Sequence, residues 1–141
     1  MKTVNLVKLS VGIDSIEHLQ SYRERLLQQG GPAHPRHITR MWPRREAEIL
    51  NGGSIYWVIK GLICCRQKVL RLEEVMGEDG IRRCAIVMDP QIIRTQTAVR
   101  RPFQGWRYLP VEDSPADLDG QGDQQQLPNE LMTALAEIGV R

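Results

Sequence analysis

The chain has 141 residues, of which 41% are hydrophobic and 26% charged, and a formal net charge of +2 at pH 7. These values are typical of a single globular domain with its own hydrophobic core, and they argue against a disordered or fibrous protein. No apolar run approaches the roughly 20 residues that a membrane helix needs. The apolar run at the start contains Lys8, which makes a poor signal peptide, so we expect a cytoplasmic protein without membrane contact.

Taken in chain order, the first half alternates strands and helices. Residues 4–11 alternate apolar and polar side chains and predict a strand. Asp14 or Ser15 can cap a helix that runs to about residue 29, with Ile16, Leu19, Tyr22 or Arg23, Leu26 and Leu27 at helical spacing against the sheet. After a proline-rich connector, residues 37–42 predict a second strand. A short helix follows over residues 44–50 and ends at two glycines.

The second half predicts strands only. Residues 54–60 are rich in β-branched and aromatic side chains, and Ile55, Trp57 and Ile59 share one apolar face, so we expect Trp57 in the core. Gly61 is expected to mark a bulge or corner before a long strand over residues 62–75. A turn at residues 77–80 and strands at 81–88, 92–99 and 106–109 complete the pattern. It predicts an α+β fold, a small curved antiparallel sheet or partly closed barrel with flanking helices.

Composition also predicts the domain organisation. We expect a single α+β domain over residues 1–109 and a flexible acidic linker over residues 110–127, which is rich in Asp, Gln, Gly and Pro. Residues 128–141 predict a terminal helix whose stripe of Leu131, Leu135 and Ile138 packs on the domain.

Charge is unevenly distributed along the chain. Residues 36–107 hold 14 basic and 7 acidic side chains, a balance of +7, whereas residues 108–141 have a balance of −6. Such asymmetry is typical of a polyanion-binding centre with an acidic tail, although arginines that merely solvate strand faces would give the same counts.

Arginine and tryptophan define the candidate site. Guanidinium groups bind phosphate oxygens through two hydrogen bonds, and indole rings stack on unpaired bases. The residues expected to bind nucleic acid are Arg40, Trp42, Arg44, Arg66, Lys68, Arg101, Trp106 and Arg107. We therefore predict a nucleic-acid-binding module that favours RNA over DNA.

Two alternatives remain open at this point. One is a protein-interaction or regulatory domain that uses the acidic tail and the last helix. The other is a hydrolase that acts on a modified nucleoside, for which the candidate groups are His37, Thr39, Glu46, Glu48, Cys64 and Cys65. No G-x-S-x-G, H-E-x-x-H, phosphate-loop or dinucleotide motif occurs, so the sequence favours binding over catalysis.

The cysteines and histidines do not form a metal motif. The three cysteines include the neighbours Cys64 and Cys65 but no C-x-x-C pair, and Pro35 between His34 and His37 prevents a regular helix there. The sequence predicts reduced thiols, and neither a metal nor a cofactor.

Four segments carry a resemblance to a known family. Residues 37–43 (HITRMWP), 52–61 (GGSIYWVIKG), 78–84 (EDGIRRC) and 101–108 (RPFQGWRY) resemble a family of short bacterial proteins of unknown function. The resemblance runs nearly end to end and implies no activity.

A second resemblance concerns the order of the elements. A strand, a short helix ending in glycine, a strand, a long strand and a hairpin are similar to PUA-like domains, and within these to the ASCH type, which is implicated in RNA binding. Those domains carry G-x-K-x-x-E-x-R after the short helix. Aligned at Gly53, this chain has Ile55, Val58 and Lys60, so only the glycine matches. The resemblance therefore implies an architecture and not a shared catalytic chemistry.

Overall fold

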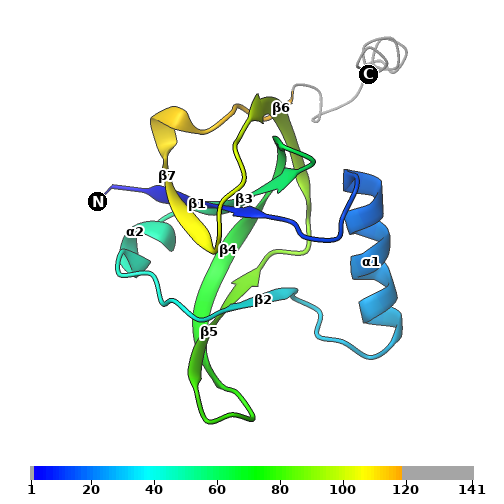
Figure 1. Ribbon diagram of the computed structural model, residues 1–141, viewed down its shortest axis with the longest axis vertical. Coiled ribbons are helices and arrows are strands. Elements are labelled where there is room, and N and C mark those ends of the chain that lie inside the picture. The colour runs from blue at the N-terminus through cyan, green and yellow to red at the C-terminus, as the bar shows by residue number, and fades with distance from the viewer. Residues whose placement is uncertain (1, 119–141) are drawn as a thin grey trace.

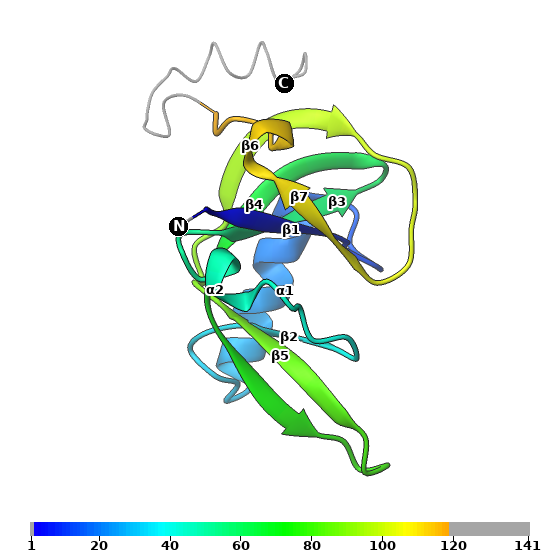
Figure 2. The same ribbon diagram turned by 90° about the vertical axis from the view of Figure 1, so that its left-hand side faces the viewer.

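The computed structural model describes residues 2–118, which form an open, curved sheet of seven strands with two helices beside it, an α+β arrangement in which the sheet predominates (Figures 1 and 2). The elements are β1 (Val4–Leu9), α1 (Ile16–Gln28), β2 (Arg36–Thr39), α2 (Glu46–Ile49), β3 (Ser54–Ile59), β4 (Leu62–Met76), β5 (Arg82–Met88), β6 (Ile93–Val99), β7 (Trp106–Pro110) and the 3₁₀ turn η1 (Val111–Asp113). Each strand lies within a few residues of its predicted position. Among the described residues no helix has the length and apolar character needed to cross a membrane.

The sheet is mixed, so the prediction of an antiparallel sheet is wrong at one pair of strands. The strand order is β2-β5-β4-β3-β1-β7, with β6 also paired to β4. Strands β1 and β3 are parallel, and every other pair is antiparallel. Parallel neighbours need a crossover connection, which here runs through α1, β2 and α2. Alternation of side chains identifies a strand but not the direction of its partner.

The β3–β4 connection is a tight hairpin turn and not the expected bulge at Gly61. Ile59 pairs with Leu62, which leaves Lys60 and Gly61 as a two-residue loop. Both have positive φ, 52° and 82°, as a type I′ turn requires. The register shift in this hairpin lies between Trp57 and Val58 instead.

The central strand β3 is buried on both faces. Ile55, Trp57 and Ile59 lie in the larger core, and the side chains between them lie in a smaller core on the opposite face with Val7 and Leu109. The prediction that Trp57 is a core residue is confirmed, since only 3% of it is exposed.

Helix α1 packs on the sheet through its first half only. The Ser15 hydroxyl caps it by accepting the His18 N–H at 3.0 Å, and Ile16 and Leu19 are buried. Leu26 and Leu27, which were expected on the same buried face, are 40% and 48% exposed. The second half of α1 therefore borders a pocket instead of completing the core.

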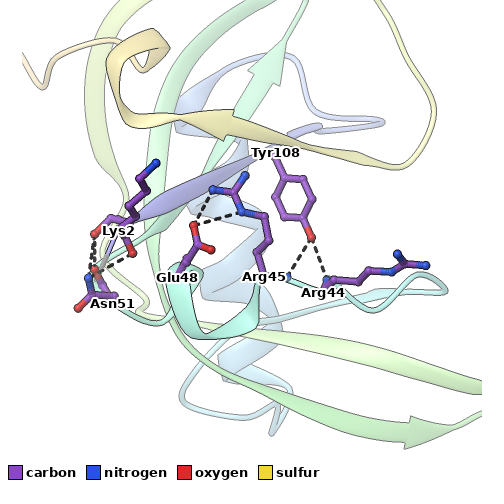
Figure 3. A network of polar contacts seen from close by, with 7 residues as sticks. Lys2, Arg44, Arg45, Glu48, Asn51 and Tyr108 are labelled. Carbon is purple, nitrogen blue, oxygen red and sulfur yellow. Dashed lines mark hydrogen bonds and ion pairs between the residues drawn. The ribbon is translucent and has the colours of Figure 1, made fainter.

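Strand β7 holds the short helix α2 in place (Figure 3). The Tyr108 hydroxyl accepts the backbone N–H groups of Arg44 at 2.9 Å and Arg45 at 3.1 Å. The Arg45 guanidinium lies over the Tyr108 ring at 5.2 Å and also pairs with Glu48 on α2. One side chain of β7 thus satisfies two donors that the start of this helix leaves without an intrahelical partner.

Residues 110–118 are packed on the sheet, so the expectation of a flexible linker is wrong for this part. Pro110 ends β7, η1 follows, and Asp117 forms an isolated bridge with Thr95 of β6. The Asp117 carboxylate also accepts two hydrogen bonds from Arg66, each 2.8 Å long. Local composition does not reveal a partner 51 positions away in the sequence, so composition alone predicts a linker here. The rest of the expected linker and the terminal helix lie outside the described residues.

Candidate anion-binding pocket

The residues predicted to bind nucleic acid do not form one surface. Trp106 is buried and donates its Nε1–H to the Met41 carbonyl at 3.1 Å. Trp42 is half-buried and donates to Glu46 at 3.1 Å. Arg107 follows Trp106 on the same strand, so its side chain lies on the opposite face of the sheet. Lys68 is exposed on β4, and Arg40, Arg44 and Arg101 are exposed in connections between strands and helices.

Two of the predicted arginines are engaged within the protein. The guanidinium of Arg66 binds Asp117 through two hydrogen bonds and Ser54 Oγ through a third, each of 2.8 Å. Arg107 lies over the ring of Phe103 at 5.2 Å, and Arg100 lies over the same ring at 5.5 Å. These contacts leave Arg66 in particular with little capacity for a phosphate.

A different place in the fold has the features of a binding site. A pocket of about 630 Å³ lies between α1, β2 and the two connections that flank α1, and Trp57 of the central sheet forms part of its lining. Figure 1 shows α1 beside the sheet, joined to β2 by a long connection below it. Apolar side chains supply much of the wall, including Ile13, Leu19, Leu26, Leu27, Pro32 and Pro35.

The charged lining of this pocket has one sign. Lys8, Arg23 and Arg36 line it together with His18 and His37, and none of the described lining residues is an aspartate or glutamate. Arg36 has an ion pair with Glu73, at 3.6 Å. Lys8 and Arg23 have no ion pair within residues 2–118. The pocket therefore favours an anionic ligand.

Arg23 is a partly buried cation that has no acidic partner within residues 2–118. Its guanidinium lies over the Trp57 ring at 6.0 Å, and its Nη1 atom is covered from solvent without a hydrogen-bond partner within residues 2–118. Burial lowers the pKa of Arg23 from its ordinary value, although an arginine remains charged at neutral pH. An uncompensated buried charge typically costs about 3–5 kcal/mol, so this position is unfavourable unless an anion offsets it.

His37 lies beside Arg23 against the same indole. Its ring meets that of Trp57 edge-on at 5.5 Å between centroids, and its Nε2 atom is buried without a partner in the described part of the chain. Burial, and then the charges of Lys8 and Arg23, lower the pKa of His37 to about 4. The imidazole is therefore neutral at pH 7 and carries one N–H that it can donate.

The rest of the site holds Trp57 in a fixed orientation. The indole Nε1–H donates to Gln67 Oε1 at 3.0 Å, and the Gln67 amide donates in turn to the Asp89 carbonyl at 3.0 Å. In the register of the sheet, Lys8 of β1 lies between Trp57 and Trp106. These contacts hold the aromatic ring in place beneath the Arg23 guanidinium, with Lys8 on the neighbouring strand.

A family model described as a protein of unknown function, DUF1489, matches residues 6–141. The chain belongs to the DUF1489 family. The prediction of membership in a family of unknown function over nearly the full length is thereby confirmed. Comparisons with curated proteins and with solved structures give no match. Within residues 2–118 of this DUF1489 chain, no three His, Cys, Asp or Glu side chains gather in a way that could hold a metal ion.

Arg23 is not among the site residues predicted from the sequence of this DUF1489 chain, although its position in the helix pattern indicates a special role. Ile16, Leu19 and Leu26 mark the inward face of α1, and Arg23 occupies a position on that face where an apolar residue is expected. A charge within an apolar stripe is a stronger indication of a ligand than an arginine on an exposed strand. From the sequence, His37 is a candidate for catalysis or for a metal pair with His34, and Trp57 is a core residue.

The low pKa of His37 predicts a loss of stability in mild acid. The pKa is about 4 in the folded protein and about 6.5 when unfolded, so the unfolded chain binds more protons between these values. The free energy of unfolding should therefore fall as the pH drops from about 6.5 to 4, by about 2 kcal/mol from this residue. Urea unfolding of the wild type and of His37→Gln at pH 7 and 4.5 measures it. Carboxylates common to both proteins cancel, and an equal loss in the two would contradict the assignment.

Proposed function

We propose that this protein binds single-stranded nucleic acid, with RNA favoured over DNA, and that the pocket bordered by α1 and β2 receives one nucleotide. The observation that carries the proposal is the guanidinium of Arg23, whose buried Nη1 atom has no partner within residues 2–118, in a pocket whose described lining residues include no carboxylate. Guanidinium groups are suited to phosphate because their N–H donors match its oxygens in pairs.

An aromatic side chain at the same pocket supports the assignment of the ligand. Tyr22 of α1 lines the pocket next to Arg23 and is 42% exposed. Exposed aromatic rings beside cationic groups are the usual elements of single-strand recognition. The volume of about 630 Å³ falls within the range of about 300–1,000 Å³ that suits a ligand of this size.

Three of the groups considered for a hydrolase, Glu46, Glu48 and Cys65, are engaged elsewhere, which supports binding over catalysis. Glu46 accepts the Trp42 Nε1–H, and Glu48 is paired with Arg45. Cys65 is buried, and its hydrogen bond with Cys64 together with its burial raises the pKa of this thiol far above its ordinary value. A thiol in that state is a poor nucleophile.

The resemblance to PUA-like domains agrees with this proposal, because domains of that type are implicated in RNA binding. We extend the proposal to that fold family and to a cytoplasmic location. The protein-interaction alternative depends mainly on residues 119–141, outside the described part of the chain, and becomes an outcome of the binding test.

Fluorescence anisotropy with mixed-sequence RNA and single-stranded DNA, across a salt series, tests the proposal. Arg23→Gln should weaken binding about tenfold, since a hydrogen bond to a charged group contributes about 1.5–3 kcal/mol. Tyr22→Ala should weaken it by about 1–3 kcal/mol if a base stacks there. The affinity of the wild type should fall steeply as salt rises.

Arg25→Gln provides the matched control. It removes the same charge from the same helix, but Arg25 is exposed and does not line the pocket. Its effect should be no more than about twofold, the size expected for one distant surface charge. Absence of binding to both RNA and DNA at low salt would overturn the proposal and leave protein interaction as the better hypothesis.

A further inference from the structure

Two buried polar atoms without a partner among the described residues belong to residues that line the same pocket. Within residues 2–118, Arg23 Nη1 and His37 Nε2 are the buried side-chain nitrogen or oxygen atoms without a hydrogen-bond partner. They come from different elements, α1 and β2, yet their groups lie against the same Trp57 ring, at 6.0 Å and 5.5 Å. Buried polar groups are nearly always hydrogen-bonded in folded proteins, so two neighbouring exceptions mark a place for a shared partner.

The chemistry of these two groups specifies that partner. A guanidinium is a donor only, and the neutral imidazole of His37 can present its Nε2–H as a donor. A partner that satisfies both must accept at least two hydrogen bonds, and beside an arginine it is best an anion. Phosphate and carboxylate oxygens meet both requirements. Lys8, which lines the same pocket, adds a second positive charge.

The depth of this place specifies how the anion is attached. Both atoms are covered from solvent, so we place them at the inner end of the pocket, where an entering ligand would meet them with its tip. An internal phosphodiester continues into the strand from two of its oxygens and needs an open path on either side. A terminal phosphate is attached through one oxygen and presents three others to the donors.

Arg23 is free to adjust to such an anion. Its side chain has no hydrogen bond or ion pair to residues 2–118, and its contact with the Trp57 ring is the interaction that holds it. A contact of this type is weaker than two charge-assisted hydrogen bonds to a phosphate. The guanidinium can therefore rotate toward a phosphate that enters the pocket.

We infer that the pocket is an end-recognition site, in which Arg23 and His37 bind the terminal phosphate of a nucleic-acid strand or of a mononucleotide. Binding of a strand end rests on the proposed function. Binding of the phosphate of a mononucleotide does not depend on it. The nucleoside next to the phosphate lies against the apolar wall that Leu26, Leu27 and Pro32 provide.

The test compares ligands that differ in one phosphate. Anisotropy measurements on the full chain use labelled 10-nucleotide RNAs with a 5′-phosphate, a 3′-phosphate or hydroxyl groups at both ends. One phosphorylated end should bind about tenfold more tightly than the unphosphorylated strand. Calorimetry with adenosine 5′-monophosphate, adenosine and inorganic phosphate distinguishes a free mononucleotide from a strand end. Adenosine 5′-monophosphate and inorganic phosphate should bind, and adenosine should not.

Three further measurements separate end recognition from simple charge attraction. A strand longer by one nucleotide carries one more charge without a terminal phosphate and should bind like the shorter strand. The preference for the phosphorylated end should disappear in Arg23→Gln, be partly kept in Arg23→Lys and be unchanged in Arg25→Gln. Circular dichroism and melting curves show whether each variant is folded, and the comparison of ligands on the wild type needs no variant.

The outcomes distinguish this inference from the proposed function. Equal affinity of the wild type for phosphorylated and unphosphorylated strands would overturn end recognition while leaving nucleic-acid binding in place. Binding of adenosine 5′-monophosphate but of no strand would support the phosphate site and overturn the proposed function. Failure of the monophosphate and of every phosphorylated strand to bind would overturn the inference outright.

Discussion

Replacing Gly53 by alanine should destabilise the protein by about 3 kcal/mol, the upper end of the cost of overpacking a rigid site. Gly53 follows α2, and its backbone lies between that helix and β1. A methyl group at this position would overlap the carbonyl oxygens of Val4 and Ile49. Both are backbone atoms of elements fixed in the fold, so neither can move aside. Urea unfolding monitored by tryptophan fluorescence measures the change.

Gly77→Ala is the matched control for this substitution. A methyl group at Gly77 also meets close neighbours, but these are the ends of the Arg83 and Asp79 side chains, which can rotate away. The expected change is within about 1 kcal/mol. Neither glycine has a positive φ, so backbone strain does not contribute to the difference. Equal stability of the two variants would show that α2 does not pack as tightly on β1 as the structure indicates.

The parts of the fold that sequence predicts well are those determined by local pattern. The Ile55, Trp57 and Ile59 alternation identifies β3 because a strand places every second side chain on one face. The two candidate caps, Asp14 and Ser15, likewise place the start of α1 to within one residue, and in the structure Ser15 is the one that caps it. The parallel pairing of β1 and β3 depends instead on the path of the connection of some 44 residues between them. The side chains of the two strands do not indicate whether the strands run in the same direction.

The candidate site was harder to predict, because an arginine is informative only together with its partners. The charge of Arg66 and its place on a strand predict a nucleic-acid contact. In the structure its guanidinium instead binds Asp117, 51 residues away in the sequence. Arg94 is bound by Glu17 at a separation of 77 residues. Arg23, by contrast, has no acidic partner within residues 2–118, and this became visible only once α1, β2 and β3 were in place.

The second large effect is expected from Trp57→Ala, which should destabilise the protein by about 3–5 kcal/mol. The indole is almost fully buried in the larger core, so its removal leaves a cavity lined by β3, β4 and α1. It also leaves Gln67 Oε1 without its donor and removes the ring that Arg23 and His37 contact. Urea unfolding measures the loss of stability.

Trp57→Phe separates the two roles of this residue. Phenylalanine keeps an aromatic face for Arg23 but lacks the N–H that satisfies Gln67, so it should cost about 1–3 kcal/mol, mainly from the unpaired amide oxygen. At a temperature where this variant is folded, its affinity for a phosphorylated strand should stay within about threefold of the wild type, because Arg23 and His37 are retained. If Trp57→Ala were instead as stable as the wild type, the indole would not be part of the core. A large loss of affinity in folded Trp57→Phe would mean that the indole itself, through its size or its N–H, takes part in binding.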